Sequence, residues 1–294
     1  AASLELAVPI DPGRSRIRVR VLARNDRDIV SVPLVIERDY APPAGDLYLV
    51  TIAVEDYDDD ELDLAAPIRD ADAFAARMEL EEGGLYETVH HKSLRGADVT
   101  RIAIDRVLQS LASDVDEQDC VIVFVAGHGA RDVIGRYFFL TADATPADPV
   151  RGVPREQLER LVLWEDLAAR RRVLLIDTCQ AGTVDETRDR GLGAADAFSQ
   201  SQVDDLVGGG LYIVSGSSKL GAARESAQNG VFTAALIAGL DGAADEEGNR
   251  NGTVDIAELI EFARRTVLEE EGPQRVTVPT VSGGDPFPIA RKSR

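Results

Sequence analysis

The sequence predicts an α/β fold in which a mainly parallel central sheet is flanked by helices, preceded by a short N-terminal β segment. Val121–Val125 and Val173–Ile176 are uninterrupted apolar runs, which are typical of strands buried on both faces. From residue 47 onward, strand-like runs alternate with stretches whose apolar residues recur at helical spacing. This alternation indicates parallel strands joined by crossover helices.

The first 46 residues differ from the rest in their periodicity. Residues 1–40 contain three alternating apolar sets that favour antiparallel strands: Leu4–Val8, Ile17–Val21 and Ile29–Ile36. They resemble the last strands of an immunoglobulin-like domain, and three strands are too few to be stable alone. Residues 41–46 contain two prolines and a glycine, which predicts a linker. Residues 47–294 are expected to form the main domain.

Strands and helices of the main domain can be assigned from the same periodicities. The sequence predicts strands over residues 47–54, 86–94, 121–129, 173–176 and 210–218, with a hairpin over 136–141 and a short polar turn that holds Cys179 after the strand 173–176. It predicts helices over 68–80, after a cap at Asp98 or Thr100, near 155–169, from a cap at Asn229 to residue 240, and over 255–268. The sequence predicts a long loop over residues 183–207. It assigns Arg170–Arg172 to the solvated start of a strand.

Composition limits the function classes. The formal net charge of −20 argues against nucleic-acid binding and suits basic substrates or cations. Two cysteines, Cys120 and Cys179, argue against a disulfide framework, and no apolar run is long enough for a transmembrane helix. The chain starts without a signal peptide, which favours the cytoplasm, although it begins inside a predicted strand and leaves the compartment open. The oligomeric state is not predicted.

Two motifs carry the candidate chemistry. Gly127-His128-Gly129 ends one buried strand, and Asp177-Thr178-Cys179-Gln180-Ala181-Gly182 ends the next, with the cysteine about 50 residues after the histidine. Open α/β sheets bind ligands at the carboxyl ends of their strands. A cysteine nucleophile needs a nearby base to hold its thiolate. The spacing therefore predicts that Cys179 and His128 lie at neighbouring strand ends.

Together the two motifs resemble those of the caspase/metacaspase superfamily, the clan CD or peptidase C14-like cysteine peptidases. The Asp-Thr-Cys-X-Ala-Gly form is closer to bacterial metacaspase-like, orthocaspase-type proteins. The resemblance covers about residues 47–291, including the tail Asp285–Arg291. It implies a caspase-like fold and a cysteine endopeptidase acting on proteins or peptides.

The resemblance also implies roles for individual residues. Cys179 would be the nucleophile, and His128 would hold the thiolate and then protonate the leaving amine. The backbone N–H groups of Gly129 and Cys179 would form the oxyanion hole. Gly129 is expected to lack a side chain so that it does not crowd a substrate. No third catalytic carboxylate and no required cofactor are implied.

Two carboxylates indicate the substrate preference. Asp177 matches the pocket aspartate two residues before the metacaspase cysteine, and Ile68-Arg69-Asp70-Ala71 resembles the segment that supplies a second one, with Arg69 as a departure. Carboxylates facing one pocket would select Arg or Lys before the cut. The alternatives are that Asp177 caps a turn and that Asp70 is an ordinary first-turn helix residue.

Self-processing is a further expectation, because family members often cut their own chain after the cysteine. Arg188 and Arg190 lie in the predicted loop over 183–207 and are the candidate cleavage positions. Alternatively, they offset the neighbouring acidic residues.

Residues 247–258 fit the pattern of an EF-hand calcium loop at several positions. The candidate ligands are Glu247, Asn249, Asn251, Asp255 and Glu258. The first is Glu rather than Asp, and no clear helix precedes the loop. The alternative is a polar loop that caps the last helix.

Two other function classes stay open at this point. The first is a catalytically silent caspase-fold module for protein interaction or signalling, although both motif residues are present. The second is a hydrolase of the same fold acting on non-peptide acyl groups. The partners expected for the preferred interpretation are basic protein or peptide substrates, with no nucleic acid and no membrane.

Overall fold

The computed structural model describes residues 45–180, 210–216, 229–271, 280–284 and 286–292, together with four short strands between residues 13 and 38. The chain divides into two compact units, Ala1–Pro42 and Pro43–Arg294. The predicted loop over 183–207, with Arg188 and Arg190, lies outside the described residues.

The N-terminal unit contains two antiparallel pairs. These pairs are β1 (Gly13–Ile17) with β4 (Leu34–Arg38), and β2 (Arg20–Leu22) with β3 (Asp28–Val30). The prediction of one strand for each apolar set was wrong for the second and third sets, because each set contributes to both pairs. The first set, Leu4–Val8, lies outside the described residues.

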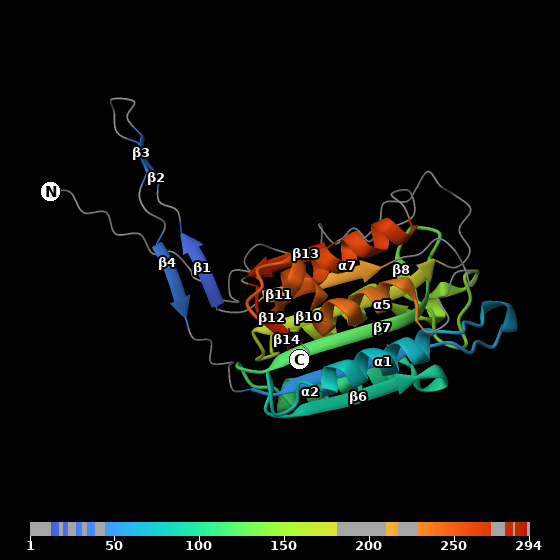
Figure 1. Cartoon of the computed structure of the whole chain (residues 1–294). Coiled ribbons are helices and arrows are strands. Elements are labelled where there is room, and N and C mark those ends of the chain that lie inside the picture. The colour runs from blue at the N-terminus through green and yellow to red at the C-terminus, as the bar shows by residue number, and fades with distance from the viewer. Residues whose placement is uncertain are drawn as a thin grey trace. The chain divides into compact units, whose positions relative to one another are not determined.

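The second unit is built on one twisted sheet with the order β13-β11-β10-β7-β5-β6 (Figure 1). Its members are β5 (Leu47–Ala53), β6 (Val89–Arg95), β7 (Cys120–Arg131), β10 (Arg171–Gln180), β11 (Gly210–Gly216) and β13 (Thr280–Gly284). All neighbours are parallel except β11 and β13. Two short strands, β8 (Tyr137–Phe139) and β9 (Val153–Pro154), extend the sheet beyond β7. The predicted α/β fold with a mainly parallel sheet is confirmed.

Helices cover both faces of this sheet (Figure 1). They are α1 (Pro67–Glu79), α2 (Arg101–Asp114), α3 (Arg155–Leu163), α5 (Val231–Ala238) and α7 (Ile256–Glu271). On one face, Phe74 of α1 stacks on Phe124 of β7 at 4.9 Å, and α5 and α7 follow α1 side by side. On the other face, α2 and α3 pack against the alternate β7 residues. No helix among the described residues is long and apolar enough to cross a membrane.

Helix boundaries follow local chemistry. Thr100 caps α2 as predicted, because its hydroxyl accepts a hydrogen bond from the Ala103 N–H at 3.1 Å. The cap of α5 is Gly230, not the predicted Asn229. After α5 the chain continues through a π-helical segment (Gly239–Ala243) into α6 (Ala244–Glu247).

Arg171 and Arg172 are not solvated, contrary to the prediction. Arg171 is buried, and burial lowers the pKa of Arg172 to about 10. The Arg172 guanidinium donates to the carbonyl oxygens of Val162, Trp164, Leu167 and Ala169. These carbonyls belong to the end of α3 and the connection that follows it. The helix α3 ends at Leu163 rather than near residue 169, and Arg172 binds the carbonyl groups that follow its end.

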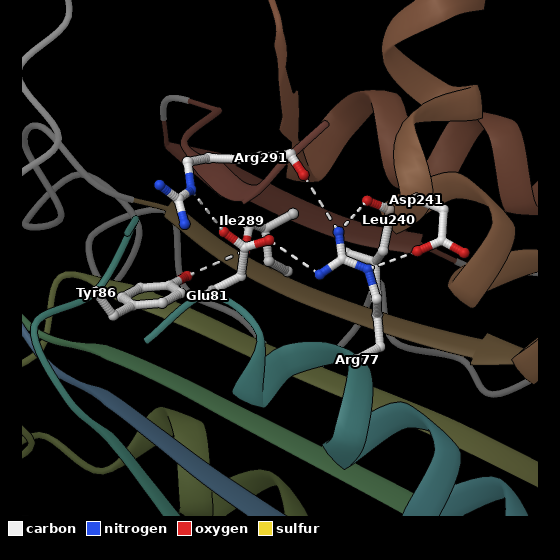
Figure 2. A network of polar contacts seen from close by, with 7 residues as sticks. All are labelled: Arg77, Glu81, Tyr86, Leu240, Asp241, Ile289 and Arg291. Atoms are coloured by element: carbon white, nitrogen blue, oxygen red, sulfur yellow. Dashed lines mark hydrogen bonds and ion pairs between the residues drawn. The ribbon is translucent and has the colours of Figure 1, made fainter. Parts of the chain in front are cut away.

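A polar network centred on the buried side chains of Arg77 and Glu81 fastens the C-terminal strand β14 (Pro288–Arg291) to α1 (Figure 2). Its members are Arg77, Glu81, Tyr86, Leu240, Asp241, Ile289 and Arg291. Arg77 donates to Glu81 at 2.9 Å, to Asp241 at 2.8 Å and to the carbonyl oxygen of Leu240. It also reaches the carbonyl oxygen of Arg291 at 3.2 Å, while the Arg291 guanidinium pairs with Glu81 at 3.3 Å. One arginine therefore joins three segments that are far apart in the sequence.

Candidate active site

The candidate site lies at the carboxyl ends of β7 and β10. In the parallel ladder between these strands, Cys179 is the register partner of His128. The backbones of neighbouring strands lie about 4.8 Å apart. The two motif residues that the sequence singled out are therefore adjacent at the edge of the sheet where open α/β folds bind ligands.

His128 is buried and held from two directions. Its Nε2 lies 2.9 Å from the carbonyl oxygen of Leu62, and its backbone N–H donates to the Tyr57 hydroxyl at 3.0 Å. The Tyr57 ring also lies against the imidazole, with 5.2 Å between centroids. Because a carbonyl oxygen only accepts, Nε2 carries a proton, and Nδ1 is the basic nitrogen of the neutral ring.

The acidic segment after β5 supplies this support. Asp63 accepts a hydrogen bond from the Tyr57 N–H at 2.9 Å, and the Tyr57 hydroxyl reaches the carbonyl oxygen of Val54 at 3.3 Å. Leu62 ends a short 3-10 helix, η1 (Asp60–Leu62). Sequence reasoning missed Tyr57 and Leu62. The available signal was the position of this segment. It follows β5, which is parallel to β7, so it begins at the edge of the sheet where β7 ends.

Steric contacts explain why glycine stands on both sides of His128. Gly127 has a φ of 147°, and an added Cβ would lie 3.0 Å from Phe139 and from the Val54 carbonyl oxygen. An added Cβ on Gly129 would lie 2.5 Å from the Tyr137 ring. The sequence explained the missing side chain of Gly129 by room for a substrate. The structure gives a different reason, since the aromatic ring of Tyr137 occupies that space.

The direction in which the Gly129 N–H points follows from the β7–β8 ladder. The Leu140 N–H donates to the His128 carbonyl at 2.9 Å, which makes Gly129 and Phe139 a non-hydrogen-bonded pair of the β7–β8 ladder. The Gly129 N–H therefore points away from β8. It points to the side on which β10 and position 179 lie.

Asp70 and Asp177 come together at the beginning of α5. Both Asp70 carboxylate oxygens accept from the Gly230 N–H, at 3.1 and 3.2 Å, and Asp177 accepts from the Thr233 hydroxyl at 2.8 Å. A Cβ placed on Gly230 would lie 3.0 Å from Asp70 Oδ2 and 3.6 Å from Asp177 Oδ2. The positive end of the α5 dipole favours carboxylates here. Asp70 is buried and Asp177 is half-buried.

The predicted calcium loop forms a different arrangement. Both oxygens of Glu258 accept backbone hydrogen bonds, from Asn249 at 2.7 Å and from Asp255 at 3.1 Å, and Asp255 accepts from the Glu258 N–H at 2.8 Å. The last two bonds form a capping box at the start of α7. Glu247 pairs instead with Arg265.

A short helix leads into the predicted calcium loop, although the sequence indicated no clear helix there: α6 ends at Glu247, which is the first residue of the loop. Among the described residues, no group of three or more His, Cys, Asp or Glu side chains is arranged to hold a metal. As arranged, the carboxylates of the loop do not fit a calcium ion, and Ca²⁺ stays a prediction that needs the loop to rearrange.

The fold is an α/β sheet with a cysteine and a histidine position paired at its carboxyl edge. The family model of the caspase domain, peptidase C14, matches residues 48–286. The chain therefore belongs to the caspase-domain family, which confirms the resemblance read from the two motifs. This family of cysteine peptidases implies protein or peptide substrates.

Solved structures show the same fold. A protein from Geobacter sulfurreducens has 17% identity and a TM-score of 0.52, with 84% of this chain and 97% of that chain covered. Caspase-1 from Spodoptera frugiperda has 15% identity and a TM-score of 0.52, with 87% and 96% covered. A search of curated protein sequences gave no significant match.

Proposed function

We propose that this protein is a cysteine endopeptidase that uses Cys179 and His128 to cleave peptide bonds after Arg or Lys. The observation that carries the proposal is the register pairing of Cys179 with a buried histidine whose Nε2–H is already engaged by Leu62. That engagement fixes the ring and leaves Nδ1 to exchange the proton of the reaction.

The proposed reaction follows from these positions. His128 takes the thiol proton, and the thiolate of Cys179 attacks the peptide carbonyl carbon. The N–H groups of Gly129 and Cys179 stabilise the oxyanion, and the direction of the Gly129 N–H supports this role. The tetrahedral intermediate then collapses, and the C–N bond breaks as His128 protonates the leaving amine. Water, deprotonated by His128, hydrolyses the thioester and regenerates the thiol.

The pair of carboxylates supports a basic preference. Asp70 and Asp177 approach the same point beside Gly230, so a cationic side chain placed there would meet two negative charges. Positional scanning with fluorogenic peptides tests the proposal. We expect Arg and Lys before the cut to be cleaved and Asp to be poor. Cleavage after Asp, or of non-peptide acyl esters alone, would contradict it. An inert wild-type chain would favour the silent interaction module.

The pocket carboxylates can be tested individually. Asp177→Ala and Asp70→Asn should lower kcat/KM for Arg peptides roughly 10- to 100-fold, because each removes a charge-assisted contact. Asp72→Asn is the matched control, since Asp72 is on the same helix but is exposed and paired with Arg95. If Asp72→Asn reduced cleavage as much as Asp70→Asn, the effect would be general electrostatics rather than a pocket.

We propose self-processing after Arg188 or Arg190 as part of the same activity. Purified protein is incubated with and without calcium and followed by intact mass spectrometry. We expect fragments ending at these arginines, and none from Cys179→Ala, with calcium increasing the yield if the loop over 247–258 binds it. An uncut chain with full peptidase activity would show that processing is not needed.

A further inference from the structure

The strand β7 changes its partner strand at the level of the candidate catalytic residues. On one side of β7, pairing with β5 ends at Ala126, and pairing with β8 begins at Gly129. Gly127 and His128 thus lie where one partner strand ends and the other begins. There the His128 carbonyl accepts from the Leu140 N–H, while the His128 N–H donates to a side chain, the Tyr57 hydroxyl.

Tyr137 of β8 reaches across this part of β7. Because β10 pairs with Gly129 on one side, β8 pairs with it on the other, which is the side of β5. The Cε2 and Oη atoms of Tyr137 are each 2.5 Å from the place where a Cβ of Gly129 would be. The Tyr137 side chain therefore passes over Gly129 toward β10.

On β10 the Tyr137 hydroxyl meets Thr178. The two oxygens, Tyr137 Oη and Thr178 Oγ1, are 2.9 Å apart, and both residues are buried. A hydrogen bond in such surroundings is stronger than one exposed to water. Thr178 directly precedes Cys179, and Gly129 directly follows His128. Tyr137 thus bonds to the neighbour of Cys179 and packs over the neighbour of His128.

We propose that Tyr137 is a positioning residue that acts through Thr178. Its hydroxyl holds Thr178, and thereby the backbone of Cys179, at the separation from His128 that the reaction requires. This rests on the proposed function. Misplacement of reacting groups by about 1 Å can cost about 100-fold in rate. Gly129 is then needed because a larger residue would expel the ring that makes the contact.

A double-mutant cycle tests the pair. Tyr137→Phe keeps the ring, and Thr178→Val keeps the shape of a β-branched residue in a strand. We expect each change to lower kcat roughly 10- to 100-fold with little change in KM. The double variant should be no worse than either single variant, because all three lack the same bond. Tyr86→Phe is the control, since this buried tyrosine hydroxyl bonds to the Ile289 carbonyl, away from the dyad.

A second measurement does not depend on peptide cleavage. Alkylation of Cys179 by iodoacetamide is followed against pH, with Cys179→Ala protein as the blank. We expect the midpoint to move up toward that of an ordinary thiol in Tyr137→Phe and Thr178→Val, because a displaced thiolate is less stabilised by His128. The midpoint should not move in Tyr86→Phe.

The two measurements separate the possible failures. A merely structural role would lower the melting temperature of Tyr137→Phe without moving the alkylation midpoint, and this would overturn the proposal. If the wild-type protein cleaves no peptide but the midpoint still moves in both variants, the proposed function fails and the positioning role stands.

Discussion

Cys179→Ala should reduce peptide cleavage to the background rate, because alanine cannot form the acyl-enzyme. His128→Ala should lower kcat/KM by about 10²- to 10⁴-fold, the usual contribution of general acid–base catalysis. Both follow from the register pairing of the two positions and from the orientation of the imidazole by Leu62. Fluorogenic cleavage of an Arg peptide gives the rates, and circular dichroism with thermal melting shows whether each variant folds.

Cys120→Ala is the matched control for this experiment. Cys120 begins β7 and lies at the opposite end of that strand from His128, fully buried. Burial raises the pKa of its thiol, so the group stays protonated and unreactive at neutral pH. The variant should keep its activity with a modest loss of stability. Full activity in Cys179→Ala, or loss of activity only in Cys120→Ala, would show that the wrong cysteine was assigned.

The main strands and the two motif positions could be predicted because their signals are local. A run such as Val121–Val125 has no polar interruption, and a histidine at its end stands out against it. Since parallel strands end at one edge, adjacency of His128 and Cys179 followed from strand order alone. Asp70 could be found only through its resemblance to a known segment, because one aspartate in a first helical turn carries no pattern of its own.

The supporting residues could not be predicted for the same reason. Tyr57 sits among exposed carboxylates in a segment without periodicity, and Tyr137 sits in a three-residue strand. Their roles arise from contacts with residues at least 40 positions away in the sequence. Charged residues were misjudged for a related reason. Arg172 looks solvated in sequence, but its long side chain donates to the Val162 carbonyl in the last turn of α3 and to the Leu167 and Ala169 carbonyls in the connection that follows.

Arg77 is a further arginine whose side chain binds protein groups rather than water. Its replacement should have the largest effect on stability. Arg77 in the last turn of α1 and Glu81 just beyond its end form an i,i+4 pair, and their side chains are 5% and 3% exposed. Arg77→Met removes the cation and leaves the buried Glu81 carboxylate with its longer contact to Arg291 (Figure 2). Removing one partner of a buried pair costs about 3–5 kcal/mol in the free energy of unfolding.

Arg77→Met should also alter the proposed substrate pocket. Arg77 holds the end of α1 to Asp241, beyond α5, while Asp70 holds the beginning of α1 to Gly230, before α5. With the first attachment lost, α1 can shift relative to α5, and the two carboxylates at Gly230 separate. We therefore expect a folded fraction of Arg77→Met to show a weakened preference for Arg over uncharged residues, with Cys179 alkylation little changed.

Urea unfolding of the wild type, Arg77→Met and Arg264→Met measures the stability effect. Arg264 is the matched control because it also forms a helical ion pair, with Glu261, but on an exposed surface. Exposed pairs of this kind contribute little, so Arg264→Met should unfold at the wild-type urea concentration. Equal midpoints for the two variants would show that the network of Arg77 is not a major source of stability. An unchanged substrate preference in a destabilised Arg77→Met protein would show that α1 keeps its place through apolar packing, such as that of Phe74 on Phe124.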